Sequence, residues 1–172
     1  MDGRRLPELA QARQADYEVL RYQLQDVEFD EAWLDAQIDT LAQPIIAAID
    51  CTACGNCCRV LDVYLEADDV PRLVQGGHIA PEQIGVWVEH PLAPEAEAWG
   101  KFRQKPCAFL RGNVCSVYAH RPDACRRYPQ FTPDFRWVLE DIAQGAALCP
   151  IIYQVLEQVL GQVDDWVRRF AT

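Results

Sequence analysis

The octapeptide CTACGNCC at residues 51–58 places four cysteines within eight positions, and the last two, Cys57 and Cys58, are neighbours. The other cysteines are Cys107, Cys115, Cys125 and Cys149. The N-terminal stretch has no apolar core of the kind a signal peptide needs, and no run of apolar residues is long enough to span a membrane. We therefore expect a cytoplasmic protein, where so many thiols are metal ligands or catalytic groups. A disulfide framework is the alternative, because eight cysteines is an even number.

The spacing of the first cysteines agrees with two kinds of metal site. Cys51 and Cys54, followed by Gly55, form the CxxCG knuckle in which two thiolates grip one ion and the glycine allows a positive φ. The spacing of Cys51, Cys54 and Cys57 also matches the start of the cysteine run in bacterial ferredoxins. The last cysteine of that run is followed by proline, as Cys149 is here. A second CxxC knuckle is missing, which disfavours an ordinary zinc ribbon. Zinc and iron-sulfur both remain open at this point.

The adjacent cysteines predict two thiol sets. Neighbouring Cα atoms lie about 3.8 Å apart, but adjacent side chains usually diverge, so Cys57 and Cys58 can serve two sites. Eight thiols divide evenly into two sets of four. One division sets Cys51, Cys54, Cys57 and Cys149 against Cys58, Cys107, Cys115 and Cys125.

Charge is unevenly distributed along the chain. The net charge of −10 argues against a nucleic-acid or anionic-membrane partner, both of which need a basic face. Residues 51–60 and 101–130, which hold seven cysteines, nevertheless carry eight basic residues and one acid, a net charge of +7. Thiolates on a divalent metal would supply the compensating negative charge. Arg59, Arg121 and Arg126 are the candidate cofactor-binding residues, pairing with thiolate charge or with carbonyl oxygens.

Apolar periodicity predicts a mainly α fold with a small irregular α+β, cysteine-rich metal-binding core. Residues 7–27 and 31–49 favour an N-terminal helical hairpin, with Asp30 as an N-cap and Pro44 inside the second helix. Residues 150–170 favour one amphipathic helix that continues through Gly161. We place a domain boundary between 1–49 and 50–172 and expect the C-terminal helix to pack against the N-terminal pair, around the cysteine core. The apolar residues expected to be buried are Trp33, Leu34, Ile38, Leu41, Val159, Val163 and Trp166.

Between the helices the pattern is broken. We expect a short strand at residues 59–65 (RVLDVYL) and a short helix, stopped by glycines, at residues 66–77 (EADDVPRLVQGG). We expect a loop at residues 90–100 (HPLAPEAEAWG). Long irregular segments in a compact domain usually indicate function or a metal in place of a core. We therefore expect residues 51–149 to depend on metal for folding.

The cysteine motifs together resemble those of the YkgJ-type CxxCxxCC family. The resemblance covers residues 51–149 and rests on CTACGNCC, PCAFLRGNVCSVYAHRPDACRRYP and a further cysteine. It implies a bacterial cytoplasmic protein with a zinc- or iron-chelating domain that uses all eight cysteines. Related domains occur in flagellin lysine N-methylases, and short members often carry names such as iron-sulfur oxidoreductase. Nothing in this chain supplies the rest of a methylase.

Other candidate groups have simpler interpretations. His78, His90 and His120 follow no ligand spacing and are expected at the surface. Asp62, Glu66, Asp68 and Asp69 fit an acidic helix start better than a catalytic or metal site. No glycine-rich phosphate loop, catalytic triad or HExxH motif is present in the sequence.

Three functions follow. The first is an iron-sulfur protein, with a 4Fe-4S cluster favoured, in a redox or protein-maturation role that involves a protein partner. The second is a zinc-stapled adaptor whose outer helices bind a partner, and the third is a metal-chelating or storage protein. Whether the chain is an enzyme, and its oligomeric state, stay open.

Overall fold

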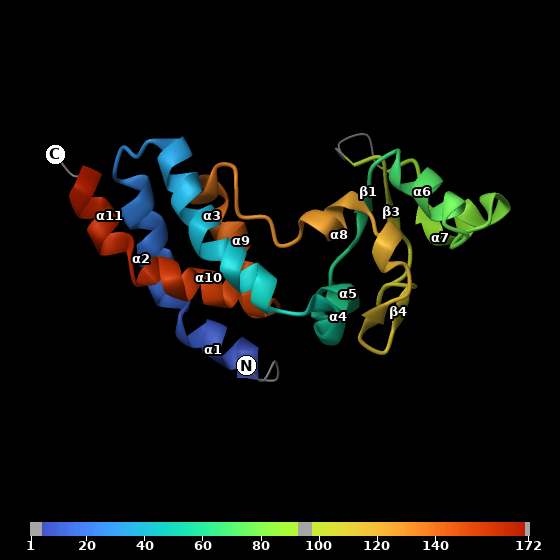
Figure 1. Cartoon of the computed structure of the whole chain (residues 1–172), viewed down its shortest axis with the longest axis horizontal. Helices are drawn as coiled ribbons and strands as arrows, with labels where there is room; N and C mark the ends of the chain where they lie inside the picture. The colour runs from blue at the N-terminus through green and yellow to red at the C-terminus, as the bar shows by residue number, and fades with distance from the viewer. Residues whose placement is uncertain (1–4, 93–97, 171–172) are drawn as a thin grey trace. The chain divides into compact units, whose positions relative to one another are not determined.

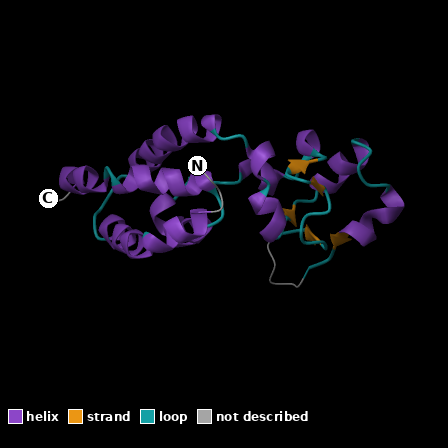
Figure 2. Cartoon of the chain, turned by 90° about the horizontal axis from the view of Figure 1, so that it is seen from below, coloured by secondary structure: helices purple, strands orange, loops and turns teal. Residues whose placement is uncertain are grey.

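The computed structural model describes residues 5–92 and 98–170, which form two compact units (Figure 1). The helical unit joins Met1–Asp50 to Pro129–Thr172, and the cysteine unit is Cys51–Tyr128. Helices dominate, and the strands, drawn in orange in Figure 2, are short and fall within the cysteine unit. The predicted mainly α fold with a small α+β region is thereby confirmed. Among the described residues, no helix has the length and apolar character to cross a membrane.

The N-terminal part of the helical unit contains three helices where two were expected. They are α1 (Leu6–Ala12), α2 (Gln14–Gln25) and α3 (Glu31–Ala48). Arg13 separates α1 from α2 without leaving helical dihedral angles. Asp30 is the predicted N-cap, because its side chain accepts a hydrogen bond of 2.9 Å from the Trp33 backbone N–H. Pro44 lies inside α3.

The C-terminal part contributes α9 (Phe135–Gly145), α10 (Pro150–Leu160) and α11 (Val163–Phe170). The prediction of one helix through 150–170 is therefore wrong, since Gly161 ends α10 as its C-cap. A glycine inside a helix is unfavourable and is readily used at a terminus. Asp35 on α3 caps α9, because its carboxylate accepts hydrogen bonds from the backbone N–H groups of Asp134, at 2.9 Å, and Phe135, at 3.1 Å.

The helical unit has its own hydrophobic core. α10 packs on α3 and α9, and α2 packs on α9 and α11. Of the residues predicted to be buried, Leu34, Ile38, Val159, Val163 and Trp166 are buried, whereas Trp33 and Leu41 are only partly so. The C-terminal helices thus pack with the N-terminal ones. The apolar stripes of the two terminal regions predicted this packing, because a lone helix cannot bury its own stripe.

The cysteine unit begins with two short helices, α4 (Cys51–Cys54) and α5 (Asn56–Val60). Strand β1 (Tyr64–Leu65) pairs antiparallel with β3 (Gly100–Phe102), which also pairs antiparallel with β2 (Val88–Glu89). Between them come α6 (Asp69–Gln75), a 3₁₀ turn at Pro81–Gln83 and α7 (Ile84–Trp87). The predicted strand and helix at 59–77 correspond to β1 and α6, and part of the predicted loop at 90–100 lies outside the described residues.

The rest of the unit is a hairpin and a short helix. The hairpin strands are β4 (Leu110–Arg111) and β5 (Val114–Cys115), joined by a two-residue turn whose first residue, Gly112, has φ +63°. A left-handed glycine at that place fits a type II′ hairpin turn. A 3₁₀ turn at Tyr118–His120 leads into α8 (Asp123–Arg127).

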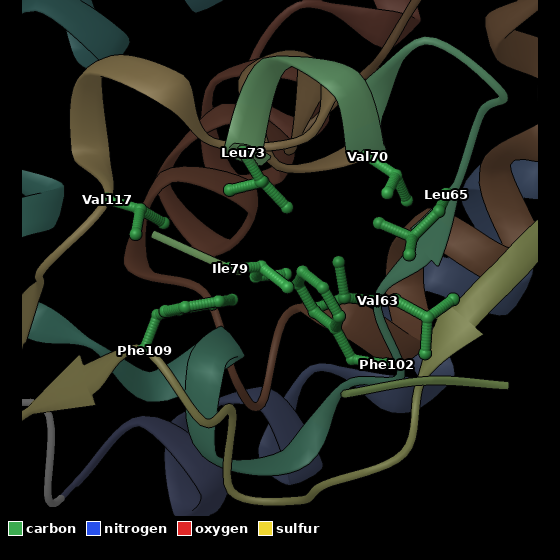
Figure 3. Close-up of a cluster of buried hydrophobic side chains, with 9 residues drawn as sticks. Val63, Leu65, Val70, Leu73, Ile79, Phe102, Phe109 and Val117 are labelled. Carbon is green, nitrogen blue, oxygen red and sulfur yellow. The ribbon is translucent and has the colours of Figure 1, made fainter. Parts of the chain in front are cut away.

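A small hydrophobic core holds the cysteine unit together (Figure 3). Leu73 and Val70 of α6 face Leu65 and Phe102 of the sheet, and Phe109 and Val117 lie before and after the hairpin. The complete set of buried residues is Val63, Leu65, Val70, Leu73, Ile79, Val88, Phe102, Phe109 and Val117. The sequence did not indicate this core, because its members come singly from separate short elements.

Candidate metal centre

The first cysteine motif folds as two helical turns that meet at Gly55. Gly55 has φ +66°, a conformation that L side chains rarely adopt. A Cβ built there would also lie 3.0 Å from Nη1 of Arg59 and 3.0 Å from the carbonyl oxygen of Asn113. Glycine is therefore required at this position both by the backbone and by the close approach of the hairpin.

Arg59 and Asn113 clamp this motif to the β4–β5 hairpin. The Arg59 guanidinium donates to the carbonyl oxygens of Cys54, at 3.1 Å, and Gly112, at 3.0 Å, and to the side-chain oxygen of Asn113. The Asn113 amide in turn donates to the carbonyl oxygen of Ala53 at 3.1 Å. The turn that carries Cys51 and Cys54 is thus held against the hairpin that carries Cys115.

Cys57 and Cys58 follow on α5 with their sulfur atoms 4.0 Å apart. The carbonyl oxygen of Cys58 accepts a hydrogen bond of 2.8 Å from the backbone N–H of Cys107. This bond joins the first cysteine motif to the segment that carries the next cysteine along the chain.

Four of the thiols form a mutually interacting group, which we call the four-thiol cluster: Cys58, Cys107, Cys115 and Cys125. Every pair among them interacts electrostatically. Cys107, Cys115 and Cys125 also pack against the hydrophobic core of the unit. The sequence analysis grouped these four thiols as one of the two sets in the division that it suggested.

Burial and neighbouring positive charge shift the pKa values of the thiols in opposite directions. Burial raises the pKa of Cys107 and of Cys115, and it raises the pKa of Cys125 to about 12, with the neighbouring thiols adding to the shift. The pKa of Cys58 is lowered to about 6, first by the hydrogen bond from Cys57 and then by the charges of Arg59 and Arg121, although burial opposes the shift. Cys58 is therefore the thiol of the cluster that ionises most readily.

Backbone N–H groups point at two of the sulfurs. Those of Phe109 and Leu110 lower the pKa of Cys107, and that of Val117 lowers the pKa of Cys115, in each case against the larger effect of burial. Donors placed two and three residues after a cysteine stabilise a sulfur that carries negative charge. The arrangement resembles that of a metal knuckle, although neither segment has the CxxC spacing.

The three candidate arginines have different surroundings. The positive charge of Arg121 lowers the pKa of Cys58, Cys115 and Cys125, and its guanidinium lies 3.9 Å from the ring centroid of Tyr118. Arg126 instead donates to the carbonyl oxygens of Arg121, at 2.9 Å, and Ala119, at 2.8 Å.

The charge of Arg121 therefore acts on three thiols of the four-thiol cluster, and the charge of Arg59 also acts on Cys58. Arg126 holds the backbone around Arg121, and Arg59 holds the first motif through its carbonyl contacts.

Asp69 is a structural residue that sequence reasoning interpreted as part of an acidic helix start. It is buried, with 1% of its surface exposed, and accepts hydrogen bonds from the backbone N–H groups of Glu66, at 2.8 Å, and Asp123, at 3.0 Å. Arg72 pairs with it and also with the Asp123 carboxylate at 2.9 Å. These bonds fix the start of α8, two residues before Cys125. No sequence signal marks a carboxylate that caps a helix 54 residues away.

The other predicted ligands have different surroundings. Cys51 is exposed and Cys54 is partly exposed on the first motif. Cys149 belongs to the helical unit, where it is buried at the N-cap of α10. Among residues 5–92 and 98–170, no three His, Cys, Asp or Glu side chains already stand in a metal-ligand arrangement.

Two histidines that the sequence treated as scattered surface residues meet in the structure. Nε2 of His78 lies 3.0 Å from Nδ1 of His120, and a Cβ at Gly76 would touch both rings. His90 stacks on Trp99 at a centroid distance of 3.8 Å. The pairing of His78 with His120 was not predictable, because 42 residues separate them.

One comparison with known proteins identifies the family. No curated protein and no solved structure matches the chain. A family model, CxxCxxCC, described as a putative zinc- or iron-chelating domain, matches residues 50–150, which is more than half of the chain. This range contains all eight cysteines, and it supports metal binding by the chain. The chain therefore belongs to the CxxCxxCC family of zinc- or iron-chelating domains.

Proposed function

We propose that the protein holds a metal centre through the four-thiol cluster. The observation that carries the proposal is that Cys58, Cys107, Cys115 and Cys125 come from separate segments and yet interact in every pair beside one hydrophobic core. Buried thiols with raised pKa values are costly to ionise unless a cation binds them. A metal supplies that cation, and the donor set, four cysteine sulfurs, suits soft metal centres.

We favour an iron-sulfur cluster as this centre, because such clusters are held by four cysteine thiolates and the four-thiol cluster offers four. When bound, such a cluster supplies one-electron redox chemistry.

The surrounding residues support a redox or protein-maturation role. Arg121 places a positive charge beside the cluster, and positive charge stabilises the reduced, more negative state of such a centre. Apolar packing on the side of Cys107 and Cys125 limits the access of water.

Zinc is the alternative, and the first motif favours it. The left-handed Gly55 between Cys54 and the α5 helix has the conformation of a zinc knuckle. With zinc as a structural metal, the cysteine unit would be an adaptor whose fold the ion stabilises. The other possibility with zinc is a chelating and storage module.

Metal and sulfide analysis of protein purified without oxygen distinguishes these functions. Iron with acid-labile sulfide and a brown colour supports the iron-sulfur protein. Zinc without sulfide in a colourless protein supports the adaptor or chelator. Folded protein without metal and with eight titratable thiols contradicts both.

A further inference from the structure

The helical unit has a groove of about 690 Å³ between α1 and α2 on one side and α9 on the other. All of its lining residues belong to the helical unit. Three of them are alanines: Ala10 lies on α1, Ala143 on α9, and Ala147 just after α9. Their short side chains leave space between the helices that longer side chains would fill.

Amide side chains come from both sides of this groove. They are Gln11 of α1, Gln14 of α2 and Gln144 of α9, and all three are exposed. A glutamine amide both donates and accepts hydrogen bonds, and so does each peptide unit of an extended chain. The lining therefore suits a peptide better than an apolar molecule.

The charged residues in the lining leave one carboxylate available. Arg21 of α2 pairs with Glu140 of α9, with 3.6 Å between Nη1 and Oε2. Glu18 of α2 is exposed and has no ion-pair partner within the part of the chain that the structure describes. A cation from another molecule can therefore pair with Glu18.

The net negative charge of the chain belongs to the helical unit. Residues 1–50 and 129–172 hold 17 acidic and seven basic residues, a net charge of −10. Residues 51–128 hold nine of each and are neutral overall. The field of a strongly negative unit attracts a positively charged partner before contact and disfavours a negatively charged one.

We propose that the groove between α1, α2 and α9 is the docking site for a basic segment of a partner protein, an extended peptide that carries lysine or arginine. One cationic side chain of the peptide pairs with Glu18, its backbone bonds to the glutamine amides, and the alanines admit its close approach. The inference goes beyond the function proposed above, because it concerns the helical unit and holds whichever metal the cysteine unit binds.

A labelled basic peptide tests the groove in the full-length protein. The probe is a short dye-labelled peptide in which lysine and arginine alternate with alanine and serine, and its binding is followed by fluorescence anisotropy. The reference probe has glutamine in place of each basic residue. Wild type is compared with Glu18→Gln, which removes the available charge, and with Ala147→Trp, which fills the groove without changing the charge. Glu28→Gln is the matched control, because Glu28 is an exposed acid of the same unit outside the lining.

We expect wild type to bind the basic peptide more tightly than the glutamine peptide. Glu18→Gln should weaken this binding by about three- to fivefold, the effect of one exposed ion pair. Ala147→Trp should weaken it at least as much, whereas Glu28→Gln should leave it nearly unchanged. Circular dichroism checks that each variant keeps its helices.

Three results overturn the inference. Equal affinity for the two peptides, or no binding of either, shows that the groove does not select a basic segment. Equal losses in Glu18→Gln and Glu28→Gln show that only the overall charge of the unit attracts the peptide. Unchanged binding by Ala147→Trp places the peptide outside the groove. None of these results affects the proposed metal centre, which metal analysis tests separately.

Discussion

The carboxylate of Asp69 at the start of α6 accepts the backbone N–H of Asp123 at the start of α8, with a distance of 3.0 Å. The same carboxylate accepts the N–H of Glu66 and pairs with Arg72. Because α8 carries Cys125, this one buried side chain connects the hydrophobic helix of the unit to a cysteine of the four-thiol cluster.

Replacing Asp69 by alanine should lower the free energy of unfolding of the cysteine unit by about 2–4 kcal/mol, since two part-buried backbone N–H groups and Arg72 lose their acceptor. Asp69→Asn, which keeps one acceptor oxygen, should cost less. The control is Asp68→Ala, because Asp68 is exposed and its side chain makes no cap hydrogen bond. Equal effects of Asp68→Ala and Asp69→Ala in urea unfolding would contradict the role of Asp69.

Alanine substitutions at three glycines distinguish the stability cost of backbone strain from the cost of a close contact. Gly77 has φ +70° with open space around it, Gly85 lies in α7 with nothing nearby, and Gly55 has both a positive φ and a close neighbour. Gly77→Ala should cost about 1 kcal/mol and Gly55→Ala about 3 kcal/mol. Gly85→Ala should be neutral or slightly stabilising. Thermal unfolding of the three variants checks this order, and a Gly55→Ala variant as stable as Gly85→Ala would refute the clamp at Arg59 and Asn113.

The Tyr17 hydroxyl in the helical unit is buried and lacks a hydrogen-bond partner within the described part of the chain. Tyr17→Phe should therefore raise the free energy of unfolding at pH 7 by about 1 kcal/mol. Tyr22→Phe is the control, because Tyr22 is half exposed.

Burial, followed by the charge of Glu157, raises the pKa of Tyr17. The stability linked to this group is therefore fully present below the ordinary tyrosine pKa of about 10 and is lost as the pH rises above it. The advantage of Tyr17→Phe should widen above pH 10 in urea unfolding. An advantage that stays constant with pH would mean that Tyr17 is hydrated in solution.

Metal removal should affect the two units differently. The helical unit has its own core, whereas the cysteine unit relies on nine buried hydrophobic residues and its thiols. After treatment with a chelator under reducing conditions, hydrogen exchange should accelerate at residues 51–128 and remain slow in α2, α3 and α10. Equal acceleration in both units would show that they unfold together.

Local signals in the sequence predicted the elements that depend on local chemistry. The Asp30 cap, the α6 helix ended by glycine and the knuckle glycine at 55 each follow from a few adjacent residues. The mainly α fold followed from the apolar stripes. The break at Gly161 was missed because the periodicity continues across it.

The long-range contacts inside the cysteine unit were not predictable from one sequence. The hydrophobic core around Leu73 gathers single residues from short elements, and the contacts of Asp69 with Asp123 and of His78 with His120 join residues far apart in the chain. The sequence suggested the four-thiol cluster only as one set in one division of the cysteines, because adjacent cysteines show that side chains diverge but not where they point.

The most direct test of the four-thiol cluster is the metal content of single-cysteine variants. Wild type, Cys125→Ser and Cys51→Ser are purified without oxygen, and metal and acid-labile sulfide are measured per folded chain, with circular dichroism to confirm that the helical unit is intact. The account predicts that Cys125→Ser loses the metal centre of the cluster, whereas Cys51→Ser retains it. Full retention of metal by Cys125→Ser would contradict the account.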